Sequence, residues 1–286
     1  MDWTILKLLT WSESYFKDHD VDSPRLTAEI LLGHCLGIQR LDLYLQYDRP
    51  LEQSELAEYK VLIKRRRQGE PVAYITGERG FYESDFSVGP GVLIPRPDTE
   101  LLLEETLSLL NEEEAGLKVL ELGVGSGALI VSLAQACPGH TYFGCDISPV
   151  ALATARKNAQ ALSETPIHFF QSSWLSAVRP EQGIDVILSN PPYIPSGDID
   201  GLASEIRNHE PRLALDGGTD GFDCYRLILE SARHCLRPGG TLIMEMGFDQ
   251  KPGMAALAET VQGFESPVFF KDLAGHDRVV RLKKIN

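Results

Sequence analysis

Strand-like and helix-like segments alternate through the second half of the chain, and this alternation constrains the fold more than any other feature. Short apolar runs typical of buried strands occur near 118–122, 141–146, 167–171, 184–189 and 240–246. Segments with helical spacing accompany them near 127–136, 149–162, 222–236 and 250–261. This pattern predicts an α/β fold, a mostly parallel, doubly wound sheet with helices on both faces. Segments 267–270 and 277–282 have no helix between them and should close the sheet as a hairpin with one antiparallel strand.

The first 75 residues have a different pattern. Apolar residues recur at helical spacing from Trp3 to about Ala73, which predicts a small domain of four or five short helices over 1–75. Asp22-Ser23-Pro24 is a typical helix start, and Gly37 is a typical stop. We interpret the basic cluster at 64–67 as a solvated helix face rather than a docking patch for an anionic partner.

Segment 76–97 is expected to be a β-hairpin linker between two domains. Strand-forming residues lie on both sides of Gly89-Pro90-Gly91, a composition that favours a hairpin. Pro95 and Pro97 should stiffen the chain before a helix of about 12 residues, which Asp98 or Thr99 could cap. The rest of the chain, 98–286, is then the second domain.

Composition narrows the possible partners. The chain of 286 residues has 41 acidic and 27 basic side chains, and its net charge of -14 opposes binding to a phosphate backbone. Five cysteines form no C-x-x-C, and the histidines are scattered, so we expect neither a disulfide framework nor a metal site. We see no export signal and no apolar run of roughly 18 residues. These features predict a cytoplasmic protein without membrane insertion.

A glycine-rich turn follows the first strand of the alternation, in the sequence Glu121-Leu122-Gly123-Val124-Gly125-Ser126-Gly127. Its glycines let a ligand approach the backbone, and the following helix offers unpaired N–H groups. Asp146 ends the next strand, 23 positions after Gly123, which suits a carboxylate that binds ribose hydroxyls. These features indicate an adenosine-containing cofactor. Gly123-x-Gly125-x-x-Ala128 also satisfies the dinucleotide fingerprint, and a glycine turn without a ligand is the remaining alternative.

The sequence Asn190-Pro191-Pro192-Tyr193 follows the strand near 184–189. Two consecutive prolines must end the strand in a stiff turn, at the sheet edge where open α/β folds bind ligands. A planar substrate nitrogen is a poor nucleophile because its lone pair is delocalised. The Asn190 side-chain oxygen and the Pro191 carbonyl could accept its two N–H bonds, and Tyr193 could stack on the planar group. This chemistry predicts methylation of such a nitrogen, and a carboxamide and a nucleobase remain rivals.

With these motifs the sequence resembles the HemK/PrmC family of protein-(glutamine-N5) methyltransferases, over nearly the whole chain. The resemblance includes the segment 93–100, the glycine turn, Asn190 to Tyr193, Glu210-Pro211, Ala214-Leu215 and Gly217-Gly218. The family uses S-adenosylmethionine to modify the glutamine of the Gly-Gly-Gln motif in class-I peptide-chain release factors. The resemblance implies a helical N-terminal domain for substrate docking, a β-hairpin linker and a class-I methyltransferase domain.

The resemblance also implies roles for individual residues. Asn190, Pro191 and Tyr193 would be catalytic, and Asn190, Pro191, Pro192 and Tyr193 would hold the glutamine. The cofactor would be held by Glu121, Gly123, Val124, Gly125, Ser126, Gly127, Asp146, Ile147, Trp174 and Asn190. Ser173 departs from the family, which often has Asp before this tryptophan. Arg96 and Glu100 could line the site or form a structural ion pair, and Glu245 could face the ligand edge or only cap a neighbouring helix.

Two other functions remain possible at this stage. Nucleic-acid amino-methyltransferases share the Asn-Pro-Pro-Tyr sequence, but the acidic charge and the lack of a basic recognition domain count against them. A non-catalytic protein that only binds a nucleotide is the second alternative.

Overall fold

The computed structural model describes residues 3–180 and 183–285, which form two compact units. The first unit comprises 1–78 together with 203–209, and the second comprises 79–202 and 210–286. The sequence places segment 203–209 in the second domain. The structure groups it with the helical unit instead, where Glu205 pairs with the buried Arg66 at 2.6 Å. None of the helices in the described part of the chain is long and apolar enough to cross a membrane.

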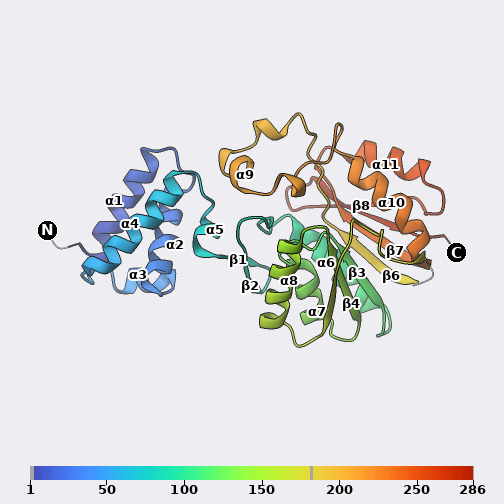
Figure 1. Cartoon of the computed structure of the whole chain (residues 1–286), viewed down its shortest axis with the longest axis horizontal. Helices are drawn as coiled ribbons and strands as arrows, with labels where there is room; N and C mark the ends of the chain where they lie inside the picture. The colour runs from blue at the N-terminus through green and yellow to red at the C-terminus, as the bar shows by residue number, and fades with distance from the viewer. Residues whose placement is uncertain (1–2, 181–182, 286) are drawn as a thin grey trace. The chain divides into compact units, whose positions relative to one another are not determined.

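The first unit is helical, as expected (Figure 1). Its helices are α1 (Ile5–Lys17), α2 (Pro24–Leu36), α3 (Arg40–Leu45), α4 (Gln53–Arg67) and α5 (Val72–Thr76), with α9 (Ser204–His209) beside them. Helix α2 has Pro24 in its first turn and ends at Gly37, whose φ of 64° is a left-handed value that suits glycine. Ile5, Phe16, Leu31 and Tyr59 belong to its buried core.

The prediction that the basic residues at 64–67 form a solvated helix face is wrong for one of them. Arg66 is only 7% exposed and makes the ion pair with Glu205, whereas Arg67 is exposed and Arg65 pairs with Glu70 at 2.6 Å. A buried guanidinium needs a partner, and the acidic side chain comes from a segment far away in the sequence.

The predicted hairpin exists but turns at a different place. Strands β1 (Glu78–Phe81) and β2 (Ser84–Ser87) are joined at Tyr82, which has a left-handed φ of 52°. Gly89-Pro90-Gly91 forms a separate tight turn, closed by the Val92 N–H on the Gly89 carbonyl, and 92–94 form no strand. Phe81 of β1 and Phe86 of β2 are both buried in the core of the second unit.

The second unit is built on a seven-stranded sheet of order β5-β4-β3-β6-β7-β9-β8. Its strands are β3 (Lys118–Leu122), β4 (Thr141–Asp146), β5 (Ile167–Gln171), β6 (Ile184–Ser189), β7 (Leu236–Glu245), β8 (Val268–Lys271) and β9 (Asp277–Lys283). The strands from β5 to β7 are parallel, and β9 is antiparallel to its two neighbours. The expected α/β class, the positions of β3 to β6 and the C-terminal hairpin are confirmed, whereas β7 begins at Leu236, before the expected start at 240.

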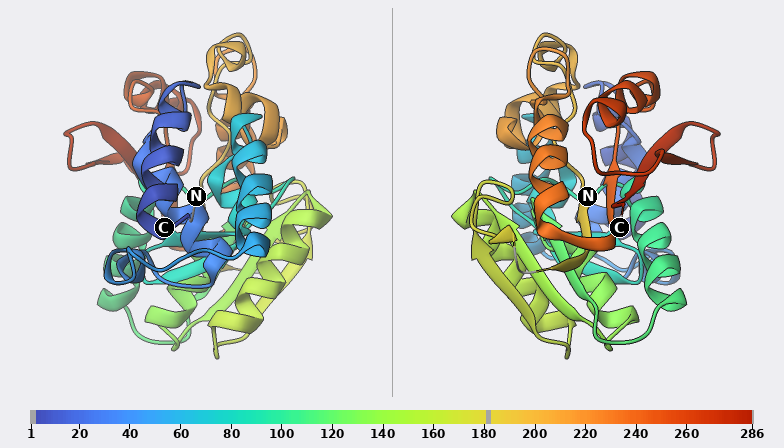
Figure 2. Two further views of the ribbon diagram at one scale, coloured as in Figure 1. Left: turned by 90° about the vertical axis from the view of Figure 1, so that its left-hand side faces the viewer. Right: turned by 90° about the vertical axis from the view of Figure 1, so that its right-hand side faces the viewer.

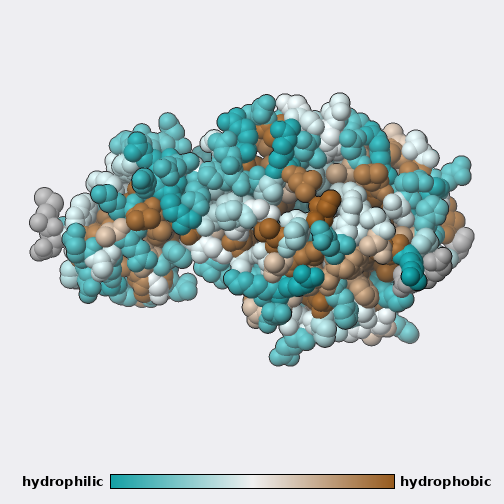
Figure 3. All heavy atoms as spheres, in the orientation of Figure 1, coloured by the Kyte–Doolittle hydropathy of each residue, from teal (hydrophilic) through white to brown (hydrophobic). Residues whose placement is uncertain are grey.

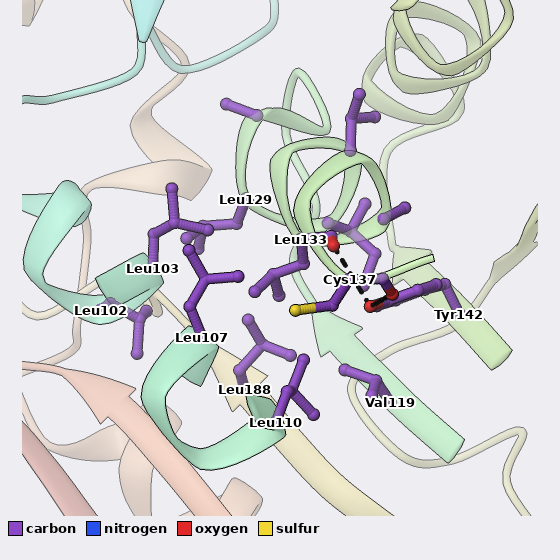
Figure 4. Close-up of a cluster of buried hydrophobic side chains, with 14 of the residues drawn as sticks. Leu102, Leu103, Leu107, Leu110, Val119, Leu129, Leu133, Cys137, Tyr142 and Leu188 are labelled. Atoms are coloured by element: carbon purple, nitrogen blue, oxygen red, sulfur yellow. Dashed lines mark hydrogen bonds between the residues drawn. The ribbon is translucent and has the colours of Figure 1, made fainter. Parts of the chain in front are cut away.

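Helices cover both faces of this sheet (Figures 1 and 2). Helices α6 (Thr99–Glu112), α7 (Ala128–Ala136) and α8 (Pro149–Leu162) lie on one face. Helices α10 (Asp223–Cys235) and α11 (Lys251–Thr260) lie on the other. Figure 4 shows leucines of α6 and α7 packed on Val119 and Leu188, with the Tyr142 hydroxyl 2.6 Å from the Cys137 carbonyl and 3.2 Å from the Leu133 carbonyl. The central strands β3 and β6 therefore bury both of their faces, as parallel strands do, whereas the edge strands β5 and β8 have no buried residue.

The strand order places a switch point between β3 and β6. The chain proceeds from β3 through β4 to β5 in one direction and from β6 to β7 in the other. Leu122 pairs with Ser189, so the residues that follow these two strands emerge side by side. Ligands of open α/β sheets bind at such a point, beyond the carboxyl ends of the strands.

Candidate active site

A cavity of about 350 Å³ lies within the second unit at the carboxyl ends of β3, β4 and β6. Ten of the predicted site residues line it: Glu121, Gly123, Val124, Gly125, Ser126, Asp146, Ile147, Trp174, Asn190 and Pro192. Gly127, Pro191 and Tyr193 are not among its lining residues. Figure 3 shows apolar residues in brown interrupting the mostly hydrophilic surface of this unit. The exposed apolar side chains at the cavity are Ile147 and Leu213.

The backbone of the glycine turn has a conformation that would be strained for residues other than glycine. Gly123, Gly125 and Gly127 all have left-handed φ values, of 73°, 53° and 81°. A Cβ atom at Gly127 would lie 3.1 Å from the Ala155 Cβ of α8, so α7 could not begin where it does with a larger residue. The turn thus exposes backbone N–H groups at the start of α7, which is suited to a polar ligand.

Asp146 holds this turn as well as facing the cavity. Its Oδ2 accepts the Gly125 N–H at 3.0 Å, and its Oδ1 accepts the Ser148 N–H at 2.8 Å. A carboxylate oxygen has more than one acceptor position, so Asp146 keeps capacity for the hydroxyls of a ligand.

Asn158 of α8 is a supporting residue that the sequence did not reveal. Its Nδ2 donates to the Ser126 carbonyl at 2.8 Å and to the Ser87 carbonyl at 3.0 Å, and its Oδ1 accepts the Ser87 N–H at 2.9 Å. The side chain is buried and ties the glycine turn to the hairpin. Its only sequence signal is a polar residue on the apolar face of a helix.

Two buried acids lie near the turn and the neighbouring strand ends. Glu121 is 3% exposed, and burial raises the pKa of its carboxyl well above the ordinary value, although the Ile130 N–H bonded to Oε2 opposes this shift. Burial likewise raises the pKa of Glu245 to about 7, against the opposing effect of the Thr99 hydroxyl bonded to it. Cys224 also lines the cavity, and burial raises its thiol pKa to about 11, so it stays protonated and is not a nucleophile.

Trp174 lies beside the glycine turn. Its ring would be 3.7 Å from a Cβ at Gly123, and its φ of 49° is unusual for a bulky residue. The Cys145 thiol donates to the Trp174 carbonyl at 3.4 Å, which helps to hold this backbone. Ser173, where the family often has Asp, also lines the cavity.

The Asn-Pro-Pro-Tyr segment is held from several sides. The Asn190 Nδ2 donates to the Thr99 Oγ1 at 3.0 Å, and the Tyr193 carbonyl accepts the Gln250 Nε2 at 3.1 Å. A Cβ atom at Gly217 would lie 2.8 Å from the Tyr193 Cα, so this part of the Gly217-Gly218 pair makes room for the segment. The Tyr193 ring packs against the apolar core, with its hydroxyl 3.5 Å from Glu245.

Arg96 and Glu100 do not act as a pair. Arg96 lines the cavity and forms an ion pair with Glu210, which also accepts the Ile94 N–H at 3.2 Å. Glu100 instead accepts the Tyr82 N–H at 3.1 Å and supports the hairpin turn. The motif at Glu210-Pro211 thus serves to hold segment 94–96 at the cavity wall.

Comparison with known proteins agrees with this architecture. Family models match for the PrmC N-terminal domain over residues 7–77 and for the Methyltransferase small domain over residues 97–219. Two solved structures share the fold. A methyltransferase from Pyrococcus furiosus has a TM-score of 0.52 and 17% identity, and the match covers 80% of this chain and 100% of that one. A T. thermophilus 16S rRNA methyltransferase, solved with AdoMet and guanosine, has a TM-score of 0.53 and 22% identity. This match covers 72% of this chain and 49% of that one.

The fold, the cavity at the switch point and the matched domain define a methyltransferase. Full-length relatives narrow the class. The release factor glutamine methyltransferase of Geobacter sulfurreducens is 43% identical over 97% of this chain and 96% of its own length. The release factor glutamine methyltransferase of Rhodopirellula baltica is 37% identical over 99% of this chain and 97% of its own length. This chain belongs to the release factor glutamine methyltransferase family, which confirms the resemblance found in the sequence.

Proposed function

We propose that this protein methylates the side-chain amide nitrogen of the glutamine in the Gly-Gly-Gln motif of class-I release factors, with S-adenosylmethionine as the cofactor. The observation that carries the proposal is the position of Asn190. It follows the strand beside the glycine turn and lines the same cavity as that turn. Its amide can therefore meet both a cofactor on the turn and an acceptor group entering the cavity.

The residues of the turn fit an adenosine-containing methyl donor. Backbone N–H groups at the start of α7 and the carboxylate of Asp146 offer donors and acceptors for its polar groups, and Trp174 offers an aromatic face for its base. S-adenosylmethionine, when bound, supplies an electrophilic methyl group for a nitrogen that needs no prior deprotonation. Glu121, Gly123, Val124, Gly125, Ser126, Gly127, Asp146, Ile147, Trp174 and Asn190 would hold it.

The acceptor side of the site supplies orientation. The Asn190 Oδ1 accepts no hydrogen bond from the residues that the structure describes, so it can accept one N–H of a glutamine amide. The Pro191 carbonyl would accept the other, and Pro192 and Tyr193 would flank the planar group. Fixing the nitrogen in this way can contribute about 7 to 11 kcal/mol to the lowering of the barrier.

The family relatives support a release factor as the protein partner, because their names state that substrate. The net charge of -14 supports a protein rather than a nucleic acid as the acceptor. A role in translation termination would place the protein in the cytoplasm, where its five free cysteines would stay reduced.

The test is methyl transfer from labelled S-adenosylmethionine to a purified class-I release factor by the full chain. We expect one label per factor, on the glutamine of Gly-Gly-Gln, and no label on a factor in which that glutamine is replaced by alanine. Equal label on both factors, or none on the native factor, would overturn the proposal. Label on DNA or RNA with a steep salt dependence would favour a nucleic-acid amino-methyltransferase. Cofactor binding in calorimetry without any methylated acceptor would favour a non-catalytic binding protein.

A further inference from the structure

The geometry points to Glu245 as a positioning residue that acts through the Thr99 hydroxyl to fix which end of the Asn190 carboxamide faces the acceptor. This relay keeps the Asn190 oxygen directed at the incoming amide and its nitrogen directed away. The inference rests on the proposed function, which gives Asn190 its role as a hydrogen-bond acceptor.

Three elements that are distant in sequence meet in this relay. Asn190 follows β6, Glu245 ends β7, and Thr99 begins α6. Ser189 pairs with Met244, so Asn190 and Glu245 leave adjacent strands at the same level. The Asn190 Nδ2 lies 3.0 Å from the Thr99 Oγ1, which lies 2.6 Å from the Glu245 Oε2. Thr99 and Glu245 are both buried, which protects the bond between them from water.

The direction of the relay follows from counting hydrogens. A hydroxyl has a single proton to donate, and an ionised carboxylate can only accept. The Thr99 proton must therefore go to Glu245, which leaves the Thr99 oxygen as an acceptor toward Asn190. Only the NH2 end of the Asn190 amide can satisfy it. With the amide turned over, two lone pairs would face each other in a buried site, which is unfavourable.

This direction matters because the two ends of a primary amide have almost the same size. Packing alone cannot select one of them, so the choice depends on hydrogen bonds. An amide turned the wrong way would present N–H groups to the N–H groups of a glutamine acceptor. The relay thus protects the orientation on which Asn190 depends.

Protonation of Glu245 would remove this preference. A neutral carboxyl can donate to Thr99, whose own proton could then be given to the Asn190 oxygen, which reverses the chain. Burial raises the pKa of Glu245 to about 7, and Asp98 adds to this effect. The Thr99 bond, Arg278 on β9 and the Tyr193 hydroxyl oppose it. Arg278 itself pairs with Asp98 at 2.9 Å, and the Tyr225 hydroxyl of α10 donates to the Glu245 main-chain carbonyl.

The test compares Glu245→Gln, Thr99→Val and Thr99→Ser with wild type from pH 5 to pH 9. For wild type, we expect kcat to fall below a midpoint near 7 and to level off about tenfold lower, because one proton controls the relay and the protonated carboxyl resembles Gln at 245. Gln at 245 can turn either way, so Glu245→Gln should lose about tenfold in kcat at pH 8 and show no such midpoint. Its KM for the release factor and its Kd for S-adenosylmethionine should stay within about twofold of wild type.

The threonine variants separate orientation from packing. Thr99→Val keeps the shape but loses the hydroxyl and should behave like Glu245→Gln, whereas Thr99→Ser should retain the wild-type rate and pH profile. Glu259→Gln is the matched control, since Glu259 is exposed on α11 and its loss should change nothing. A wild-type kcat and pH midpoint in Glu245→Gln would overturn the relay.

A second measurement does not depend on the acceptor. In 15N-labelled protein, the two side-chain NH2 proton signals of Asn190, assigned with Asn190→Asp, should shift with a midpoint near pH 7 and lose this response in Thr99→Val. If the titration is present but no release factor is methylated, the relay stands and the proposed function falls. If the factor is methylated but neither the signals nor kcat depends on Glu245, the relay falls and the function stands.

Discussion

Asn190 has to donate and accept hydrogen bonds at the same time, as its partner Thr99 also does. Its NH2 group is held by Thr99, and its oxygen remains for the acceptor. Replacement by alanine removes both bonds without crowding the cavity. We expect Asn190→Ala to lower kcat by about two to three orders of magnitude, as the loss of one oriented polar contact can.

The measurement for Asn190→Ala is single-turnover methyl transfer, with the Kd for S-adenosylmethionine and the melting temperature determined alongside. Asn208→Ala is a matched control, because Asn208 is exposed and belongs to the first unit. A loss in kcat smaller than tenfold would contradict the catalytic role of Asn190.

Tyr193 offers a ring and a hydroxyl whose roles can be separated. The hydroxyl is 3.5 Å from Glu245, a long and weak hydrogen bond, whereas the ring is half-buried against the core. If the ring matters more, Tyr193→Phe should keep kcat within about tenfold of wild type, and Tyr193→Ala should lose far more. Thermal unfolding of both variants checks that the ring's packing is not the cause. A Phe variant as inactive as the Ala variant would exclude the stacking role.

Residue types at strand ends could be predicted from the sequence, but their partners could not. A glycine turn, Asp146 and Asn190 each stand directly after an apolar run, so the sequence alone assigns them to one sheet edge. Thr99 and Glu245 are separated by 146 positions, and Arg96 and Glu210 by 114. No local pattern records such pairings, because they depend on how the strands and α6 pack together.

At the scale of elements, the spacing of apolar residues predicts the regular strands and helices. It does not predict the position of a turn where two turn-forming sequences lie close together. The predicted bounds of β3, β4, β5 and β6 match the structure because each is a short apolar run between polar turns. The hairpin turn was placed wrongly, because Gly89-Pro90-Gly91 is a stronger turn signal than the Tyr82-Glu83 turn that the packing of Phe81 and Phe86 selects. The short helices α9, η2 (Ile199–Gly201) and η3 (Arg212–Ala214) are too short to show any period.

Helix α8 supports the glycine turn through Asn158, and this contact is testable. Asn158→Ala would leave the Ser126 and Ser87 carbonyls and the Ser87 N–H without their partner. Unsatisfied buried groups cost about 1 to 3 kcal/mol each, so we expect lower stability and at least tenfold weaker binding of S-adenosylmethionine. Denaturant unfolding and calorimetry measure the two effects. Gln160→Ala, an exposed change on the same helix, should alter neither, and unchanged cofactor binding in Asn158→Ala would refute the supporting role.

At the scale of the whole molecule, the division into a helical unit and a sheet-based unit follows from a change of periodicity near residue 76. The assignment of 203–209 does not, because it depends on contacts with residues far away in the sequence, such as the ion pair between Arg66 and Glu205, and on no sequence pattern. To measure the stability of the second unit by itself, unfolding of the chain has to be followed by a signal that comes from that unit alone. Trp174 lies in the second unit, whereas Trp3 and Trp11 lie in the first. Replacing the latter two by Phe leaves a fluorescence signal from the second unit alone.

With this signal, the buried acids predict an unusual pH dependence of stability. Burial raises the folded-state pKa of Glu245 from 4.5 to about 7 and raises that of Glu121 in the same direction. Between these values the folded state binds more protons than the unfolded state, so the free energy of unfolding falls as pH rises. The contribution of Glu245 is fully present below pH 4.5 and is lost as pH rises through 7.

The size of this effect follows from 1.36 kcal/mol per pKa unit, which makes the contribution of Glu245 about 3 kcal/mol. Gln at 245 cannot ionise, so the stability of wild type relative to Glu245→Gln should decrease by about that amount between pH 4.5 and pH 8 and then stay constant. Urea unfolding at each pH measures the difference. Glu259→Gln should run parallel to wild type throughout, because Glu259 is exposed on α11. Parallel curves for Glu245→Gln as well would mean that Glu245 titrates alike in the folded and unfolded states, which would also remove the physical basis for a pH-controlled relay to Asn190.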